Sequence, residues 1–233
     1  MGMIKLLPIL LAVAYGLVMW RFSTWRLHSE LDAKSRLLDD PELAALTGKM
    51  AKALDLERLR VFVHEVDVIN GLAAPDGRIF ITRGFLAAKA AGKVTAEELA
   101  SVIAHELGHV ALGHSRRRMI DFSGQNALRT ALAMVLGRFI PGLGPAIANG
   151  AMTVMMARLS RSDEFEADAY ASALLTKSGI GTAPQKSLFA KLDHLTGARG
   201  ASTPAWFLSH PPAPKRIAAI EGNERKWHGA PLS

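Results

Sequence analysis

The chain has 233 residues, of which 49% are hydrophobic, enough to bury one sizeable core and more consistent with one domain plus an appendage than with two domains. It contains no cysteine, so disulfide scaffolds, thiolate metal sites and cysteine nucleophiles are excluded, and any metal must be bound by His, Asp or Glu. The formal net charge is +7, but no motif of interleaved basic and aromatic residues accompanies it. We therefore expect no nucleic-acid partner and favour an anionic lipid surface.

The first 25 residues have the composition of a membrane anchor. Residues 6–20 carry no charge, and Phe22 and Trp25 follow as an interfacial aromatic belt would. A cleaved signal peptide is an alternative, but it needs small residues after the apolar stretch, where Arg21 and Phe22 stand. A helix buried in the protein is the third alternative. We predict a retained, single-pass anchor over residues 1–25, with membrane localisation and lipid as a partner.

Beyond the anchor, we expect a charged linker over residues 26–36, one domain over residues 37–222 and a tail over residues 223–233. Alternating apolar residues between turn signals predict short strands, and capping residues before apolar runs predict helices. The expected strands are 59–63, 66–69 and 78–82, with turns at Asn70-Gly71 and 75–77, and the expected helices are 39–54, 95–114, 160–178 and 215–221. Helices around a small sheet indicate a mostly helical α+β domain.

Residues 139–157 form a second uncharged run that is long enough to span a bilayer. Pro141 and Pro145, together with the glycines around them, favour two helices joined by a bent loop instead. Such a pair would either cover the core or dip into lipid.

The strongest chemical signal is His105-Glu106-Leu107-Gly108-His109, an H-E-x-x-H motif inside the helix expected over 95–114. One helical turn separates the two histidines, so both imidazoles can bind one ion. Glu106 lies about 100° around the helix from His105, where its carboxylate can take a proton from a metal-activated water. Gly108 shares the histidine face and would leave room for a substrate. The alternative is a core helix whose histidines bind no metal.

A catalytic zinc site has three protein ligands and one open position, so a third ligand is required. His114 is a weak candidate because a helix would turn it about 140° away from His109, at the surface or beside a ligand. The carboxylates between Asp163 and Asp168 are a better source. Helical periodicity lets only Glu164 and Asp168 point into the site together. One of these two should bind zinc, and the other should orient a ligand histidine or its neighbour.

Four blocks stand in chain order: Asn70-Gly71 with residues 77–84, the H-E-L-G-H motif, S-R-S-D-E-F-E-A-D-A-Y over residues 160–170, and His210-Pro211-Pro212 with Arg216. In these blocks the sequence resembles the HtpX and CAAX prenyl protease type of zinc metallopeptidase, a family of mostly membrane-bound gluzincins. The resemblance covers residues 37–222. This chain differs from members of that family in having one convincing membrane segment instead of several and in having Gly71 where alanine is usual. We therefore do not expect prenylated substrates.

The resemblance implies a zincin fold with one Zn²⁺ per chain, Glu164 as the third ligand and Asp168 as the residue that supports a ligand. It also places His210 near the metal, where it would stabilise the oxyanion or fill the fourth ligand position. A histidine that merely packs under the C-terminal loop is the alternative for His210.

Together, the motifs and the resemblance predict a zinc-dependent metalloendopeptidase that acts on unfolded or membrane-associated polypeptides. Glu106 would accept the proton of the attacking water and deliver it to the leaving amine. Residues 78–82 would hold an extended substrate if they form an exposed edge strand, but not if they form a buried strand. Two other functions stay open from the sequence: a protease-like scaffold that binds without cleaving, and a zinc hydrolase of a non-peptide substrate.

Overall fold

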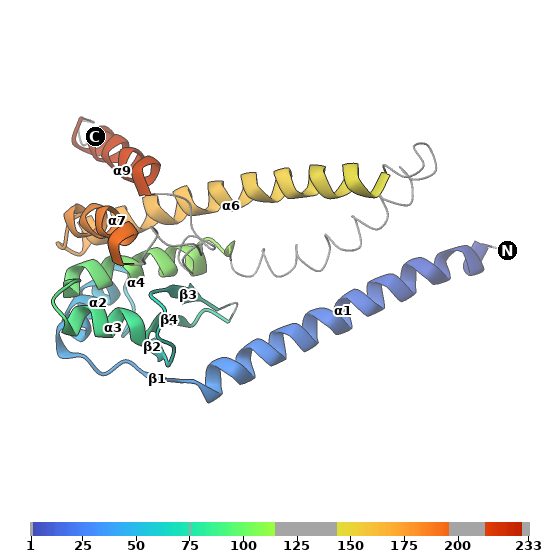
Figure 1. Cartoon of the computed structure of the whole chain (residues 1–233), viewed down its shortest axis with the longest axis horizontal. Coiled ribbons are helices and arrows are strands. Elements are labelled where there is room, and N and C mark those ends of the chain that lie inside the picture. Colours follow the sequence, from blue (N-terminus) through green and yellow to red (C-terminus); the bar gives the residue numbers. More distant parts are fainter. Residues whose placement is uncertain (1, 75, 115–143, 196–212, 230–233) are drawn as a thin grey trace. The chain divides into compact units, whose positions relative to one another are not determined.

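The computed structural model describes residues 2–74, 76–114, 144–195 and 213–229 (Figure 1). The chain divides into two compact units. Unit 1 comprises residues 1–33 and 114–160, and unit 2 comprises residues 34–113 and 161–233. Unit 2 contains the candidate metal ligands of the H-E-x-x-H motif and of the 160–170 block.

Unit 1 contains α1 (Gly2–Ala33), a continuous helix that includes most of the segment expected to be a linker. Its described side chains include the exposed residues Tyr15, Leu17, Phe22 and Trp25. Among the residues the structure describes, no helix combines the length and the hydropathy needed to cross a bilayer.

The long helix α6 (Gly144–Lys177) begins in unit 1 and continues into unit 2. The expected start of a capped helix at Ser160 is therefore wrong, because the chain is already helical there. Pro145 does not prevent this, since a proline in the first turn of a helix lacks only an N–H that has no partner within the helix. Residues 144–157 belong to this one helix, so the break between two helices expected around Pro145 is wrong, whereas Pro141 lies outside the described residues.

Unit 2 contains a four-stranded sheet in the order β1-β2-β4-β3. The central pair is parallel, and both outer strands run antiparallel to their neighbours. The predicted strands at 59–63 and 78–82 are confirmed, with shifted ends, whereas the first strand was not predicted. The strands are β1 (Ser35–Leu37), β2 (Val61–His64), β3 (Gly71–Ala73) and β4 (Ile79–Thr82).

Two expectations about the chain around the hairpin of β3 and β4 are wrong. Gly71 pairs with Ile81 and begins a strand, so the turn predicted at Asn70-Gly71 is wrong, and residues 66–69 form no strand. The chain reverses near Gly77, as the turn expected over residues 75–77 predicts, and the φ of +88° at Gly77 suits a residue without a side chain. Strand β4 is buried and paired on both sides, so it is not an exposed edge; β3 is the edge strand beside it.

Two helices of unit 2, α2 (Pro41–Ala53) and α4 (Ala96–Ala111), begin at recognisable caps. The Asp40 side chain accepts a hydrogen bond from the Leu43 amide at 3.0 Å, and Thr95 and Glu98 form the predicted capping box. The helix after Thr95 ends earlier than expected because Gly113, with a φ of +70°, leaves the helical conformation. Besides these two and the second half of α6, the helices described in unit 2 are α3 (Arg83–Ala90), α7 (Ala183–Leu195) and α9 (Ala213–Gly229).

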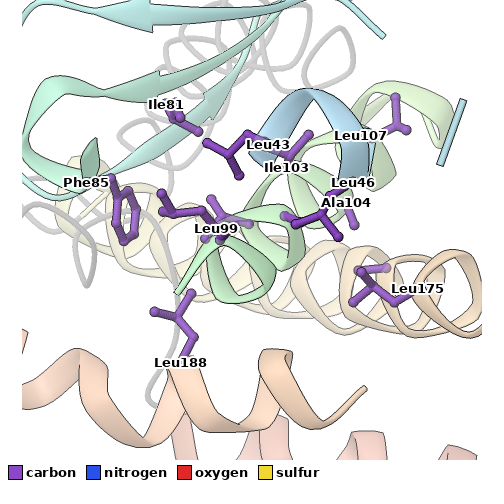
Figure 2. Packing of buried hydrophobic residues seen from close by; sticks show 14 of the residues in the cluster. Leu43, Leu46, Ile81, Phe85, Leu99, Ile103, Ala104, Leu107, Leu175 and Leu188 are labelled. Atoms are coloured by element: carbon purple, nitrogen blue, oxygen red, sulfur yellow. The ribbon is translucent and has the colours of Figure 1, made fainter. Parts of the chain in front are cut away.

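Helix α4 lies at the centre of this unit and is buried along almost its whole length. It contacts α2 and α7 and also the strands β3 and β4. Figure 2 shows Leu99 and Ile103 of α4 among the apolar side chains of the core that these elements share. A helix surrounded in this way has no solvent-facing side, so the polar side chains on it must be satisfied inside the protein.

Candidate metal centre

Two histidines of α4 converge on one point. His105 and His109 are buried, with 2% and 3% of their surfaces exposed, and their Nε2 atoms lie 3.1 Å apart. The two rings meet edge to face, with centroids 4.7 Å apart. The expected spacing of one helical turn therefore brings the two nitrogens together.

Glu164 of α6 completes a three-residue cluster with these histidines. Its Oε2 lies 3.3 Å from His105 Nε2, and its Oε1 lies 3.4 Å from His109 Nε2. Two atoms bound tetrahedrally to zinc at about 2.05 Å are about 3.3 Å from each other, so the triangle of donor atoms has the right size for one ion. Among the described residues, this is the only cluster of at least three His, Cys, Asp or Glu side chains suited to a metal.

The neighbouring carboxylates of α6 follow the expected helical phase. Asp168, one turn after Glu164, also points at His105, with its Oδ1 2.9 Å from His105 Nδ1. Glu166 is exposed, and its Oε1 accepts a hydrogen bond from the Ser162 hydroxyl. Asp163 is buried but does not belong to the metal cluster. Because Nδ1 of His105 donates to Asp168, its Nε2 is left facing the cluster.

Arg216 of α9 is fully buried beside these residues. Its Nε and Nη2 donate to the two oxygens of Asp168, each at 2.7 Å. Its guanidinium carbon lies 4.1 Å from the centre of the Phe189 ring of α7. The sequence had marked Arg216 only through the family resemblance, and no spacing pattern connects it to the metal motif.

The ionisation of the centre reflects these contacts. Burial and the nearby guanidinium of Arg216 lower the pKa of His105, but the hydrogen bonds that its ring donates to Asp168 and Glu164 outweigh them and raise this pKa to about 9. Burial acts to raise the pKa of Asp168, but Arg216 and His105 hold it below its usual value. Without a metal, the site therefore favours a protonated His105 beside an ionised Asp168.

Close packing between helices depends on Gly108. A Cβ at this position would lie 3.0 Å from the main-chain oxygen of Ala167 and 3.3 Å from Cβ of Tyr170, both on α6. We expected Gly108 to leave room for a substrate, but it leaves room for α6 instead. This crossing brings Glu164 to the two histidines.

Glu106 lies on the side of α4 that faces the edge strand. It is 2% exposed, and a Cβ placed on Gly71 of β3 would come within 3.0 Å of its Oε1 and 2.8 Å of Cγ1 of Val102. The main chain of β3 thus passes directly beside the Glu106 carboxylate, with no side chain between them.

Two other residues that the sequence singled out are His210 and His114. His210 lies outside the described residues. His114 is fully buried, so a surface position is wrong for it, and it is not part of the three-residue metal cluster.

Comparisons with known proteins identify relatives of this chain. Residues 37–224 match the model of peptidase family M48. The metalloprotease LoiP of Escherichia coli (strain K12) is 29% identical over 179 residues, 76% of this chain and 68% of LoiP. The metalloprotease YcaL of the same organism is 32% identical over 158 residues, 68% of this chain and 59% of YcaL. A protease HtpX homolog of Bordetella avium is 30% identical over 151 residues, 54% of this chain and 52% of that homolog. The matched part of this chain thus spans about half to two thirds of the length of these relatives.

Proposed function

Because this chain belongs to peptidase family M48 and is a metalloendopeptidase, we propose that it binds one Zn²⁺ through His105, His109 and Glu164. Family membership confirms the resemblance and the expected peptidase activity. It favours a peptidase over the two alternatives, a scaffold that does not cleave and a hydrolase of a non-peptide substrate. The donor set supports zinc, since two imidazoles and one carboxylate with an open fourth position are typical of catalytic zinc in peptidases. The separations of 3.1 to 3.4 Å among the donor atoms carry the assignment.

We propose Glu106 as the general base. Zinc bound at the cluster would supply an activated water and a Lewis acid for the scissile carbonyl. Glu106 follows His105 directly in the sequence and is buried, so its carboxylate can take up the proton of that water and return it to the leaving amine. His105 keeps its orientation through Asp168.

We propose that an extended stretch of polypeptide pairs with the outer edge of β3, the last strand of the sheet among the described residues. The Ala74 amide donates to the Arg78 carbonyl at 2.8 Å, and the Thr82 amide donates to the Asn70 carbonyl at 3.1 Å. Since antiparallel pairs alternate, the main-chain groups of Gly71 and Ala73 point away from β4. A substrate strand paired with them would run beside Glu106. Such pairing needs an unfolded segment, which suits unfolded or membrane-associated polypeptides as substrates.

The activity is tested with purified, zinc-loaded protein and unfolded casein. Casein should be cleaved, and Glu106→Gln should lower the rate about 10²- to 10⁴-fold, because general-base catalysis contributes that much, while zinc content stays at one per chain. A Glu106→Gln protein that cleaves at the normal rate would remove Glu106 from the mechanism.

The substrate edge is tested with a pair of proline variants. Ala73→Pro removes an outward N–H, so KM for casein should rise while the fold is kept, because proline is tolerated on the open side of an edge strand. Leu72→Pro is the matched control, because the same alternation turns its N–H toward β4 and its loss should lower the melting temperature. Unchanged KM in Ala73→Pro would contradict pairing at this edge.

His210 is proposed to stabilise the oxyanion or to fill the fourth ligand position at rest, as the resemblance implies. His210→Ala should then change the activity on casein. Activity equal to that of the unaltered chain would mean that His210 has neither role.

Residues 1–25 are proposed to anchor the protein in a membrane. The proposal is supported by the uncharged run at residues 6–20 and by the exposed apolar side chains of α1. Expressed protein should stay in the membrane fraction after carbonate extraction, and its intact mass should include residues 2–25. Release by carbonate, or a chain that starts near residues 21–30, would contradict the anchor.

A further inference from the structure

The C-terminal helix α9 contributes no atom to the metal cluster, yet one of its side chains reaches the site. Arg216 projects from α9 and has none of its surface exposed to solvent. Burying a guanidinium is costly unless it is paired and fully hydrogen-bonded. The pairing is with Asp168, through the two parallel hydrogen bonds that planar guanidinium and carboxylate groups form best.

This pairing fixes the position of Asp168. Its Oδ1 accepts hydrogen bonds from both His105 Nδ1, at 2.9 Å, and Arg216 Nη2, at 2.7 Å. The carboxylate cannot rotate without breaking one of the two, so the orientation of Arg216 is passed to the ring of His105. The main-chain oxygen of Asp168 is also held, by the Ser172 hydroxyl at 2.8 Å.

Arg216 is itself held by the docking of α9 on α7. Its guanidinium lies over the Phe189 ring, and Ile220, one turn further along α9, is fully buried. Closer to the end of α9, Glu224 accepts a hydrogen bond from Lys186 Nζ of α7 at 2.8 Å. The interface between α7 and α9 therefore contains two kinds of contact. Arg216 extends to the metal centre, whereas the hydrogen bond between Lys186 and Glu224 involves no residue of that centre.

We propose that Arg216 is a positioning residue that couples the docking of α9 to metal binding by holding Asp168, and through it His105, in the geometry that the metal requires. This inference rests on the proposed metal site. When α9 is docked, His105 is pre-oriented and the metal binds without reordering it. By thermodynamic linkage, the bound metal in turn strengthens the docking of α9.

The test measures the Kd for Zn²⁺ by competition with a chromophoric chelator in the full chain. Arg216→Met should weaken binding about 10- to 100-fold, the range found when the partner of a ligand histidine is lost. Arg216→Lys restores the charge without the paired geometry and should recover part of the loss. Lys186→Met, the matched control, should loosen α9 while leaving the Kd unchanged.

A double variant separates this role from a merely structural one. If Arg216 acts through Asp168, Arg216→Met combined with Asp168→Asn should bind zinc about as weakly as either single variant. Hydrogen exchange of α9 amides should slow on adding zinc to the unaltered chain but not to Arg216→Met. An unchanged Kd in folded Arg216→Met, or losses that add in the double variant, would overturn the inference.

Should Arg216→Met fail to fold, Arg216→Lys decides by the same measurements, and an unchanged Kd with normal zinc-dependent exchange overturns the inference. The unaltered chain separates the two hypotheses. If it binds no zinc, the proposed metal site fails. If it binds zinc and the Arg216 variants bind it equally well, only the positioning role fails.

Discussion

The two halves of the metal centre are built in different ways. On one side, His105, Glu106 and His109 belong to five consecutive residues of α4, and the turn of that helix alone sets their relative positions. On the other side, Glu164 and Arg216 come from α6 and α9 and meet only when both helices pack in place. Substitutions in the first half should therefore alter the chemistry, whereas substitutions in the second half should alter chemistry and packing together.

The largest effect is expected from Glu164→Ala, which removes the one proposed ligand of the second half. Zinc content should fall well below one per chain, and casein cleavage should be lost with it. Glu166→Ala is the matched control, because this carboxylate lies on the same helix but is exposed. If Glu166→Ala loses zinc and Glu164→Ala keeps it, the assignment of the helix face is wrong. Metal analysis of both variants provides the measurement.

A smaller effect is expected from Asp168→Ala, which keeps all three proposed ligands but removes the partner of His105. Zinc affinity or activity should fall about 10- to 100-fold, as for other acceptors that orient a ligand histidine. Chelator competition and casein cleavage measure the two quantities. If Asp168→Ala matches the unaltered chain in zinc affinity and in activity, His105 needs no support from Asp168.

The pH dependence of zinc binding should be about tenfold per pH unit below pH 9. Because the pKa of His105 in the metal-free protein is raised to about 9, zinc must displace a proton there, and its affinity should rise with pH up to that value. The metal-free fold has the opposite dependence. Its His105 proton adds stability below pH ~6.5 that is lost as pH rises through about 9. Zinc titrations and thermal melts between pH 6 and 10 test both signs.

The smallest effect concerns the distance between the halves. Gly108→Ala places a Cβ 3.0 Å from the Ala167 main-chain oxygen, so α4 and α6 must separate slightly, at a cost of about 1–3 kcal/mol in the free energy of unfolding. Gly48→Ala, in α2 with nothing within 4 Å of its Cβ, should instead stabilise by about 0.5–1 kcal/mol. Equal melting temperatures for the two variants would show that the crossing is not tightly packed.

The sequence by itself determined the first half of the site and the helical phase of the second. Thr95 and Glu98 predicted where α4 begins, and the spacing of His105 and His109 predicted that their rings converge, because both depend on contacts within one helix. The same argument selected Glu164 and Asp168 from their neighbours. Residues four apart lie on the same face of a helix wherever that helix packs in the fold.

The tertiary structure decided what depends on partners distant in the chain. Asn70-Gly71 has the local composition of a turn, but pairing with Ile81 makes Gly71 part of the edge strand. Gly108 was explained only by the backbone of α6 against it. Arg216 acquired a role only because α9 docks on α7 and carries the guanidinium to Asp168. Pairing across a sheet and contact between helices join residues far apart in sequence, and no local propensity or spacing encodes them.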